Sequence, residues 1–441
     1  MSGLRDRMNR LRGASGTELP AAAELEERMD ENTEAEDAAA ASDTATEEEA
    51  ERLGPEWNEL GVAISTNAHG SFLLRRIQYD ASFRHGIHAM EEWPIAAPFL
   101  SAFYPAERLH EETVLFLDLE TTGLGVGAGN VPFMIGLAYW KDGAVTVEQA
   151  LIRHPAEERA MLAYLQSLAA SFTHLVTYNG KSFDWPLMQS RFIMNGMGSS
   201  IWQPLHLDFL HPARSVWRNT LTSCRLSHVE EMRLGITRID DVPGSLAPQL
   251  YFQFLAEGDP NVLAGVYRHN ETDMLSLVCL AIRFGHLLSD RDVRSYVQHP
   301  TEPEEMVRTG LWLEKMGKCS YSEELFQLAE HMDSAAAPTL LMLAARDKKA
   351  GNWTRAVLLW QKVVNQMSKY AASALHEAAV ELSMYYEHKL KDYESALHYA
   401  TIASDRALAQ LQLQRRDKKS RNELDELNKR ISRLEGKLSR C

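Results

Sequence analysis

Two carboxylates stand two residues apart at the end of an apolar run, in the segment VLFLDLETTGL that begins at Val114. Side chains two residues apart on a β-strand point to the same side, so Asp118 and Glu120 are expected to project together from the strand's carboxyl end. Because neighbouring carboxylates repel each other and lose hydration, a bound divalent cation is favourable there. Oxygen ligands favour Mg²⁺ or Mn²⁺ over zinc. The alternative is that both acids are simply solvated.

Two further acids could reach the same pocket. Asp184 follows the apolar segment THLVTYN and precedes the helical pattern DWPLMQSRFIMNG. Its alternative role is that of an ordinary helix N-cap. Asp273 lies four residues after His269 in a helical segment, so the two side chains share one helix face. A pair of this kind is also common on helix surfaces and in satisfied protein cores.

The elements expected around these residues alternate between strand and helix. Three apolar segments come first, and KDG forms a hairpin turn between the second and third. Helix and strand patterns then alternate, which predicts an α/β domain with a mixed sheet over residues 111–290. The expected strands cover 114–120, 131–140, 144–152 and 173–179, and the expected helices cover 156–172, 184–196 and 263–288.

The segments before this domain differ sharply in composition. Residues 1–53 are rich in Ala, Glu, Asp, Ser and Thr, and 14 acidic and 5 basic residues lie among the first 50. Such a segment buries too little apolar surface to offset its ordering entropy, which predicts disorder. Residues 54–110 contain strand-like stretches and are interpreted as a β-rich N-terminal extension of the next domain. Most of the net charge of −15 therefore comes from the acidic segment, and it does not exclude a nucleic-acid substrate.

The C-terminal part is predicted to be helical. Three aromatic residues, Tyr321, Trp353 and Tyr393, begin similar helical patterns and are separated by 32 and 40 residues. Residues 303–410 thus resemble tetratricopeptide repeats, whose period is about 34 residues, and are expected to bind a protein partner. Residues 411–441 form a basic helix with a short leucine seam, which could instead hold nucleic acid.

Composition limits the class of protein. The chain is 45% hydrophobic and 24% charged, as in soluble globular proteins, and it lacks an apolar run of membrane-spanning length. Its basic N-terminus has no apolar stretch, which argues against a secretory signal. The cysteines show no CxxC spacing and are expected to be reduced thiols of a cytoplasmic protein. They are Cys224, Cys279, Cys319 and Cys441.

Two other motifs invite a functional interpretation. The loop GLGVGAGN follows a strand, as in dinucleotide-binding proteins, but two acids precede it and would repel a pyrophosphate. The next segment continues as a strand instead of opening a helix, so no nicotinamide cofactor is expected. The segment HLDFLH could pass for a metal cluster of His206, Asp208 and His211. The favoured interpretation is that Asp208 ends a strand and the histidines are incidental.

The order of the acidic motifs resembles that of the DEDD (DnaQ-like) family of 3′–5′ exonucleases, which have a ribonuclease H-like fold. The segments DLETTGL, YNGKSFDWPLMQSRF, HPARSVWR, DDVPGSLAPQLYF and HNETDMLSL are more closely similar to the YprB-type ribonuclease H-like proteins, a bacterial branch. The similarity covers about residues 60–290. It implies a ribonuclease H-like mixed sheet flanked by helices, followed by an all-α helical-repeat domain.

The resemblance also implies roles for single residues. Four carboxylates would bind two Mg²⁺ or Mn²⁺ ions, with Asp118 bridging both, and His269 would take a proton from the attacking water. The spacing departs from the family in one respect. Members with a histidine base hold it five residues before the last Asp, where this chain has Arg268, and members with a tyrosine hold it four before, where this chain has His269. The implied metal ligands are Asp118, Glu120, Asp184 and Asp273.

Candidate substrate contacts surround these acids. Thr121 and Thr122 lead into glycines that let backbone N–H groups approach a terminal nucleotide. In HPARSVWR, arginine charge lies beside Trp217, which could stack on a base or pack into the core. The candidate phosphate contacts are Asn179, Lys181, Arg214 and Arg218.

Two functions follow from these patterns. The first is a divalent-metal-dependent 3′–5′ exonuclease that hydrolyses phosphodiester bonds of single-stranded DNA or RNA by a two-metal mechanism. The second is a weakly active or inactive nuclease-like module that binds nucleic acid and is recruited to a protein partner by its helical repeats. The presence of all four acids favours the first function. The unusual spacing of His269, four residues before Asp273, keeps the second open.

Overall fold

A computed structural model of the chain describes residues 53–123, 129–198, 201–289, 299–332, 334–366, 372–413 and 418–440. The acidic segment predicted to be disordered lies outside the described residues except at its last position, and so does most of the glycine-rich loop. Among the helices of the described part, none is long and apolar enough to cross a membrane.

Seven strands form one mixed sheet in the order β1-β2-β7-β6-β5-β8-β9. The first five pair antiparallel, and β5, β8 and β9 run parallel. The mixed sheet predicted from the sequence is therefore confirmed, and β1 and β2 continue it beyond β7. The strands are β1 (Val62–Asn67), β2 (Gly70–Asp80), β5 (Val114–Thr121), β6 (Pro132–Lys141), β7 (Ala144–Leu151), β8 (His174–Thr177) and β9 (Leu205–Asp208).

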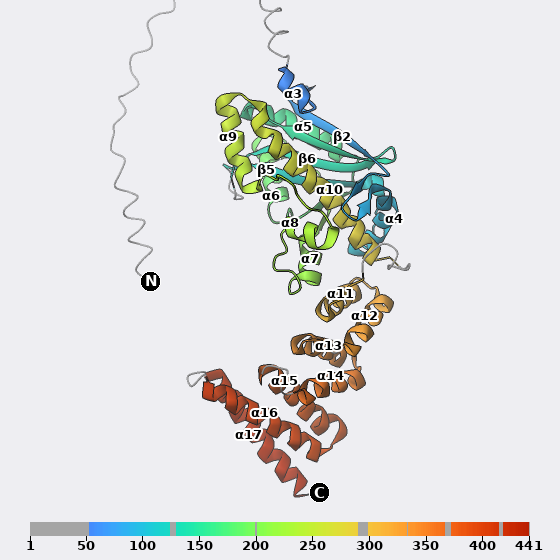
Figure 1. The fold of residues 1–441 in the computed structure, drawn as a ribbon, viewed down its shortest axis with the longest axis vertical. Helices are drawn as coiled ribbons and strands as arrows, with labels where there is room; N and C mark the ends of the chain where they lie inside the picture. Colours follow the sequence, from blue (N-terminus) through green and yellow to red (C-terminus); the bar gives the residue numbers. More distant parts are fainter. Residues whose placement is uncertain are drawn as a thin grey trace, which may run out of the picture. The chain divides into compact units, whose positions relative to one another are not determined.

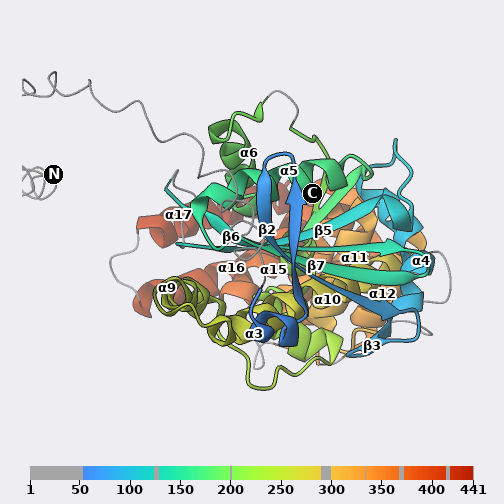
Figure 2. The ribbon, with the colours of Figure 1, turned by 90° about the horizontal axis from the view of Figure 1, so that it is seen from above.

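Helices cover both faces of this sheet. Figure 2 shows α5 and α6 on one side of the sheet and α9 and α10 on the other. The side chains of Val114 and Phe116 alternate with Leu115 along β5 and join the hydrophobic core that contains the α10 side chains. Asp118 and Glu120 continue the same alternation and so lie on the α10 side. The helices are α5 (Glu158–Ala169), α6 (Asp184–Met194), α7 (Leu210–Trp217), α8 (Leu226–Val229), α9 (Ala247–Glu257) and α10 (Ala264–Leu287).

The segment before β5 packs against the far end of α10. A Cβ atom at Gly285 would lie 2.5 Å from the carbonyl oxygen of Ala96, so the close approach of α4 and α10 requires a glycine. Trp93 of α4 is fully buried and meets the ring of Phe116 on β5 edge to face. The elements of this segment are α3 (Pro55–Glu59), β3 (Arg84–His85), β4 (His88–Ala89) and α4 (Trp93–Ala96).

The C-terminal region is helical, as predicted, and Figure 1 shows it as successive helices. Three of its helices, α11, α13 and α15, begin at residues 303, 337 and 372, and each is followed by a helix that packs against it. In the last helix, Leu427 and Leu434 of the predicted leucine seam are buried, and Glu387 accepts hydrogen bonds from Arg433 and Lys437. The helices are α11 (Pro303–Lys315), α12 (Cys319–His331), α13 (Ala337–Ala350), α14 (Trp353–Asn365), α15 (Ala372–Tyr385), α16 (Tyr393–Leu413) and α17 (Lys418–Leu438).

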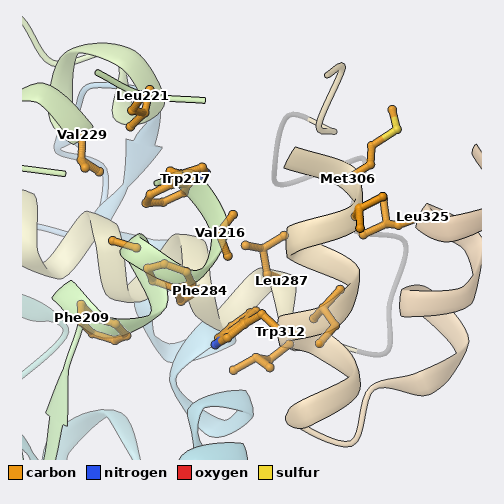
Figure 3. Packing of buried hydrophobic residues seen from close by; sticks show 14 of the residues in the cluster. Phe209, Val216, Trp217, Leu221, Val229, Phe284, Leu287, Met306, Trp312 and Leu325 are labelled. Carbon is orange, nitrogen blue, oxygen red and sulfur yellow. The ribbon is translucent and has the colours of Figure 1, made fainter. Parts of the chain in front are cut away.

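An aromatic cluster connects the sheet region to these helices. Figure 3 shows Trp217 of α7, Phe284 of α10 and Trp312 of α11 packed in sequence, with ring centroids 5.4 and 5.2 Å apart. Trp217 is fully buried, and its indole N–H donates to Glu305 of α11 at 2.9 Å. The suggestion that Trp217 stacks on a nucleic-acid base is therefore wrong, and its alternative role in the core is correct. One hydrophobic cluster contains residues of both the sheet region and the C-terminal helices. The packing therefore marks no division there, and the predicted domain boundary at residues 290–303 stays a prediction.

Candidate active site

Four carboxylates lie at the carboxyl edge of the parallel strands. Asp118 and Glu120 lie at the end of β5, Asp184 begins α6 after the neighbouring β8, and Asp273 comes from α10, which crosses the sheet. Burial raises the pKa of Asp118 well above its usual value, and the negative charges of Asp273, Asp184 and Glu120 raise it further. The residues predicted to act together are thus brought together.

Burial is the main cause of the raised pKa values of the other three acids. Burial raises the pKa of Glu120, and the charges of Asp273 and Asp184 add to that effect. Burial likewise raises the pKa of Asp184 to about 7 and that of Asp273 above its usual value. Buried carboxylates with raised pKa values are stabilised by binding either a proton or a cation. The pocket therefore attracts positive charge.

Asp184 does not cap its helix. It is the first residue of α6, Phe183 holds the N-cap position, and no side chain makes the capping hydrogen bond. The alternative interpretation of Asp184 as an ordinary N-cap is therefore wrong.

One cation inside the pocket was not foreseen from the sequence. Arg238 comes from the loop between residues 235 and 243 and donates to the carboxylate of Asp273. It also forms a bidentate pair with the fully buried Glu230 at 2.6 and 2.7 Å, and it contacts Asp241 at 3.1 Å. Burial lowers the pKa of Arg238, but Glu230 and Asp273 outweigh that effect and raise it. Arg238 thus offsets part of the negative charge around Asp273.

His269 lies beside the same group. Its Nδ1 is 2.9 Å from Asp241 Oδ1 and 3.1 Å from Arg238 Nη1, and its Nε2 is 3.6 Å from Asp273 Oδ2. A Cβ atom at Gly244 would lie 3.0 Å from Nε2, so a glycine there leaves the imidazole edge room. His269 and Asp273 share a helix face, as the four-residue spacing indicates.

The carboxylates fit a hard divalent cation by their chemistry. All four supply oxygen ligands, and their raised pKa values show uncompensated negative charge. Among the described residues, however, no three His, Cys, Asp or Glu side chains already form a metal-holding group. Asp273 is instead paired with Arg238, a cation of the protein itself.

A chain of buried amides holds the orientation of Asp118. Arg75 of β2 donates to the side-chain oxygen of Gln149 on β7 at 2.8 Å. The Gln149 amide donates to Asn270 Oδ1 at 3.0 Å and to the Tyr267 carbonyl at 2.7 Å. Asn270 in turn donates to Asp118 Oδ2 at 3.1 Å. The β2 extension of the sheet is thus connected to the site.

A glycine makes room for this chain. Gly136 on β6 stands opposite Asp118 on one side and Gln149 on the other. A Cβ atom there would lie 2.3 Å from Asn270 Oδ1, so a glycine lets Asn270 pack over the strand. Neither Asn270 nor Gln149 was identified from the sequence, because only the strand register and the docking of α10 bring them together.

Asp208 holds the loop that precedes Asp184. It ends β9, as predicted, and its carboxylate accepts backbone hydrogen bonds from Asn179 at 2.8 Å and Lys181 at 3.1 Å. Asn179 has φ 71°, a left-handed conformation that these bonds help to maintain. His206 bonds the hydroxyl of Thr177, so the HLDFLH segment serves to shape this loop.

The predicted substrate residues fall into separate places. Thr121 donates to the Gly123 carbonyl and Thr122 accepts from the Val131 backbone, so both hydroxyls shape the loop after β5. Asn179, Arg214 and Arg218 line a cavity of about 570 Å³, whereas Lys181 lines another of about 240 Å³ beside α11.

Comparison with known proteins gives two similarities. The chain matches the RNase H superfamily over residues 115–284, which contain all four carboxylates. It is also 34% identical over 397 residues to a protein of Bacillus subtilis (strain 168) that carries the name "Uncharacterized protein YprB". That similarity covers 87% of this chain and 90% of the relative, so it extends well beyond the superfamily match.

Proposed function

The chain belongs to the YprB family of the RNase H superfamily, and from this premise we propose that it is a divalent-metal-dependent 3′–5′ exonuclease of the DEDD type acting on single-stranded nucleic acid. The observation that carries the proposal is that Asp184 of α6 and Asp273 of α10 lie close enough to the end of β5 for their charges to act on both Asp118 and Glu120. Such concentrated charge suits a site for two Mg²⁺ or Mn²⁺ ions.

The chain's own residues have distinct parts in hydrolysis. Asp118, Glu120, Asp184 and Asp273 would hold the ions, which supply an activated water and stabilise the leaving oxygen. Asn270 keeps Asp118 in one orientation through its hydrogen bond. Arg238 provides a positive charge within reach of a phosphate bound at these acids.

His269 is the proposed proton acceptor. When its Nδ1–H donates to Asp241, the lone pair of Nε2 is left on the side of Asp273. A histidine exchanges protons near neutral pH and can take one from a water molecule bound among the carboxylates. The four-residue spacing before Asp273 thus suits a general base.

A second candidate is a nuclease-like module that binds nucleic acid without efficient cleavage. Two observations favour it: Arg238 already pairs with Asp273, and the described side chains do not form a ready metal-holding group. The helical pairs that begin at residues 303, 337 and 372 have the spacing of tetratricopeptide repeats. We propose that they bind a protein partner under either function.

Cleavage of labelled single strands distinguishes the two candidates. Purified protein with Mn²⁺ or Mg²⁺ is incubated with 5′-end-labelled DNA and RNA, with chelator and Asp118→Asn as controls. A ladder that shortens from the 3′ end, and that both controls abolish, is the expected result. Strands that bind but stay intact under all metals and pH values would contradict the nuclease and support the binding module.

Replacing Asn270 with alanine is expected to lower the cleavage rate about 10- to 100-fold, the usual effect of losing a residue that orients a metal ligand. The buried amide of Gln149 would lose one of its two hydrogen-bond acceptors as well, at a cost of about 1–3 kcal/mol in unfolding free energy. Rates are compared under conditions where calorimetry shows both proteins folded. Thr272→Ala on the same helix is the control, since its hydroxyl bonds only the helix's own Arg268 carbonyl. An Asn270→Ala protein that cleaves at the wild-type rate would refute the positioning role.

A further inference from the structure

The largest cavity described above is lined by three arginines. Arg214 lies on α7, Arg218 directly follows that helix, and Arg225 directly precedes α8. The cavity has a volume of about 570 Å³, within the range of about 300–1,000 Å³ that is usual for ligand pockets. Arg225 was not among the residues that the sequence singled out.

The cavity opens at the same edge of the sheet as the carboxylates. Tyr178 and Asn179 directly follow β8 and form one of its walls. Because β5 and β8 are parallel neighbours, residues after β8 lie at the edge where β5 ends in Asp118 and Glu120. A strand whose end lies among the carboxylates can therefore continue toward the arginines.

The three arginines are exposed and, like the exposed Arg108 and Arg268, form no ion pair with a described carboxylate. Among the described residues, no Asp or Glu side chain forms an ion pair with Arg214, Arg218 or Arg225, although the chain carries a net charge of −15. The neighbouring Arg233 and Arg238, by contrast, are both paired with buried glutamates. Water screens the mutual repulsion of three exposed like charges, and an anion between them would reduce it further.

The positive charges of two of the guanidinium groups reach a residue that lines the cavity. Burial raises the pKa of the Cys224 thiol, and the positive charges of Arg214 and Arg218 oppose that rise. Cys224 itself lines the cavity, so both charges reach it. The wall also contains the hydroxyls of Thr222 and Ser223, which can donate hydrogen bonds to an anion.

We propose that this cavity binds a backbone phosphate of the substrate strand, upstream of the bond that is cut. The proposal rests on the proposed function. Guanidinium groups match phosphate geometry and remain charged at any physiological pH, and the leucines and Tyr178 of the wall can contact the adjoining sugar or base. The arginine cavity would fix the strand's position while the carboxylates act on its 3′ end.

Binding of a fluorescent single strand in chelator, where no cleavage occurs, tests the cavity directly. The variant with Arg214→Gln, Arg218→Gln and Arg225→Gln is expected to bind at least about 10-fold more weakly, and its log Kd should depend less steeply on log salt, by about 0.7 per lost phosphate contact. Arg108→Gln is the matched control, because Arg108 is exposed and precedes β5 at the opposite edge of the sheet. Wild-type affinity and wild-type salt dependence in the triple variant would overturn the proposal.

Two further measurements are needed. The first shows whether the bound phosphate belongs to a nucleic-acid strand or is a free ion. The second separates the cavity proposal from the proposed function. Affinity that rises with strand length, and that inorganic phosphate at constant ionic strength reduces only weakly, supports a strand phosphate. Equal competition by inorganic phosphate without any length dependence overturns it in favour of a free-phosphate site.

With Mn²⁺, a raised KM and unchanged kcat in the triple variant support the cavity. Failure of the wild type to cleave refutes the proposed function alone, because binding in chelator still decides the role of the cavity.

Discussion

Replacing Asp118 with asparagine is expected to reduce the rate of phosphodiester hydrolysis by about 10³–10⁴-fold, the scale of losing a central catalytic residue. The amide keeps the shape of the side chain but removes the negative charge that a divalent ion requires. Asp118 is the carboxylate on which the charges of Asp273, Asp184 and Glu120 all act. Initial rates on a labelled single strand, at saturating Mn²⁺, measure the effect.

The same substitution is expected to leave stability unchanged or to raise it. An acid whose pKa is raised in the folded state is destabilising once the pH exceeds its unfolded value, because its charge is then held in an unfavourable place. Removing the charge of Asp118 removes that cost, so thermal unfolding should shift upward at neutral pH. Asp142→Asn, in the turn between β6 and β7, is the matched control and should change neither rate nor stability. An Asp118→Asn protein that retains a tenth of the wild-type rate would contradict the catalytic role.

Replacing His269 with alanine is expected to lower kcat by about 10²–10⁴-fold, the usual contribution of a general base. Its contacts with Asp241 and Asp273 place it beside the carboxylates, and its removal leaves the four proposed metal ligands intact. KM for the strand and the Mn²⁺ concentration for half-maximal rate should therefore change little.

Arg268→Ala supplies the comparison for His269. Arg268 is the preceding residue of the same helix, is exposed, and occupies the position where the DEDD exonucleases that the sequence motifs resemble carry a histidine base. Steady-state kinetics should show a normal kcat for Arg268→Ala. If Arg268→Ala loses activity and His269→Ala does not, the assignment of the base is wrong.

The fold could be predicted because its central elements carry strong local patterns. The buried run of β5, the hairpin of β6 and β7, and the long apolar α10 each follow from local side-chain periodicity. The pairing of Asp118 with Glu120 on one face follows from the same alternation. Residues within one strand or helix are the easiest to relate from the sequence.

The remainder of the site depends on contacts between distant segments. Arg238 reaches Asp273 from a loop 35 residues earlier, and Asn270 meets Asp118 across 152 residues. Neither contact leaves a periodic signal, since each depends on how α10 docks on the sheet. Trp217 shows the same limit, because a tryptophan beside two arginines fits both a binding surface and a core until α11 is placed against it.

Uptake of Mn²⁺ by the full-length protein, measured by calorimetry with and without a nucleoside monophosphate, tests the convergence of the four carboxylates most directly. The wild type is expected to bind up to two ions per chain, and both Asp118→Asn and Asp184→Asn are expected to lose this binding while Asp142→Asn binds normally. No uptake of Mn²⁺ or Mg²⁺ by the folded wild-type protein, even with the nucleotide present, would contradict it.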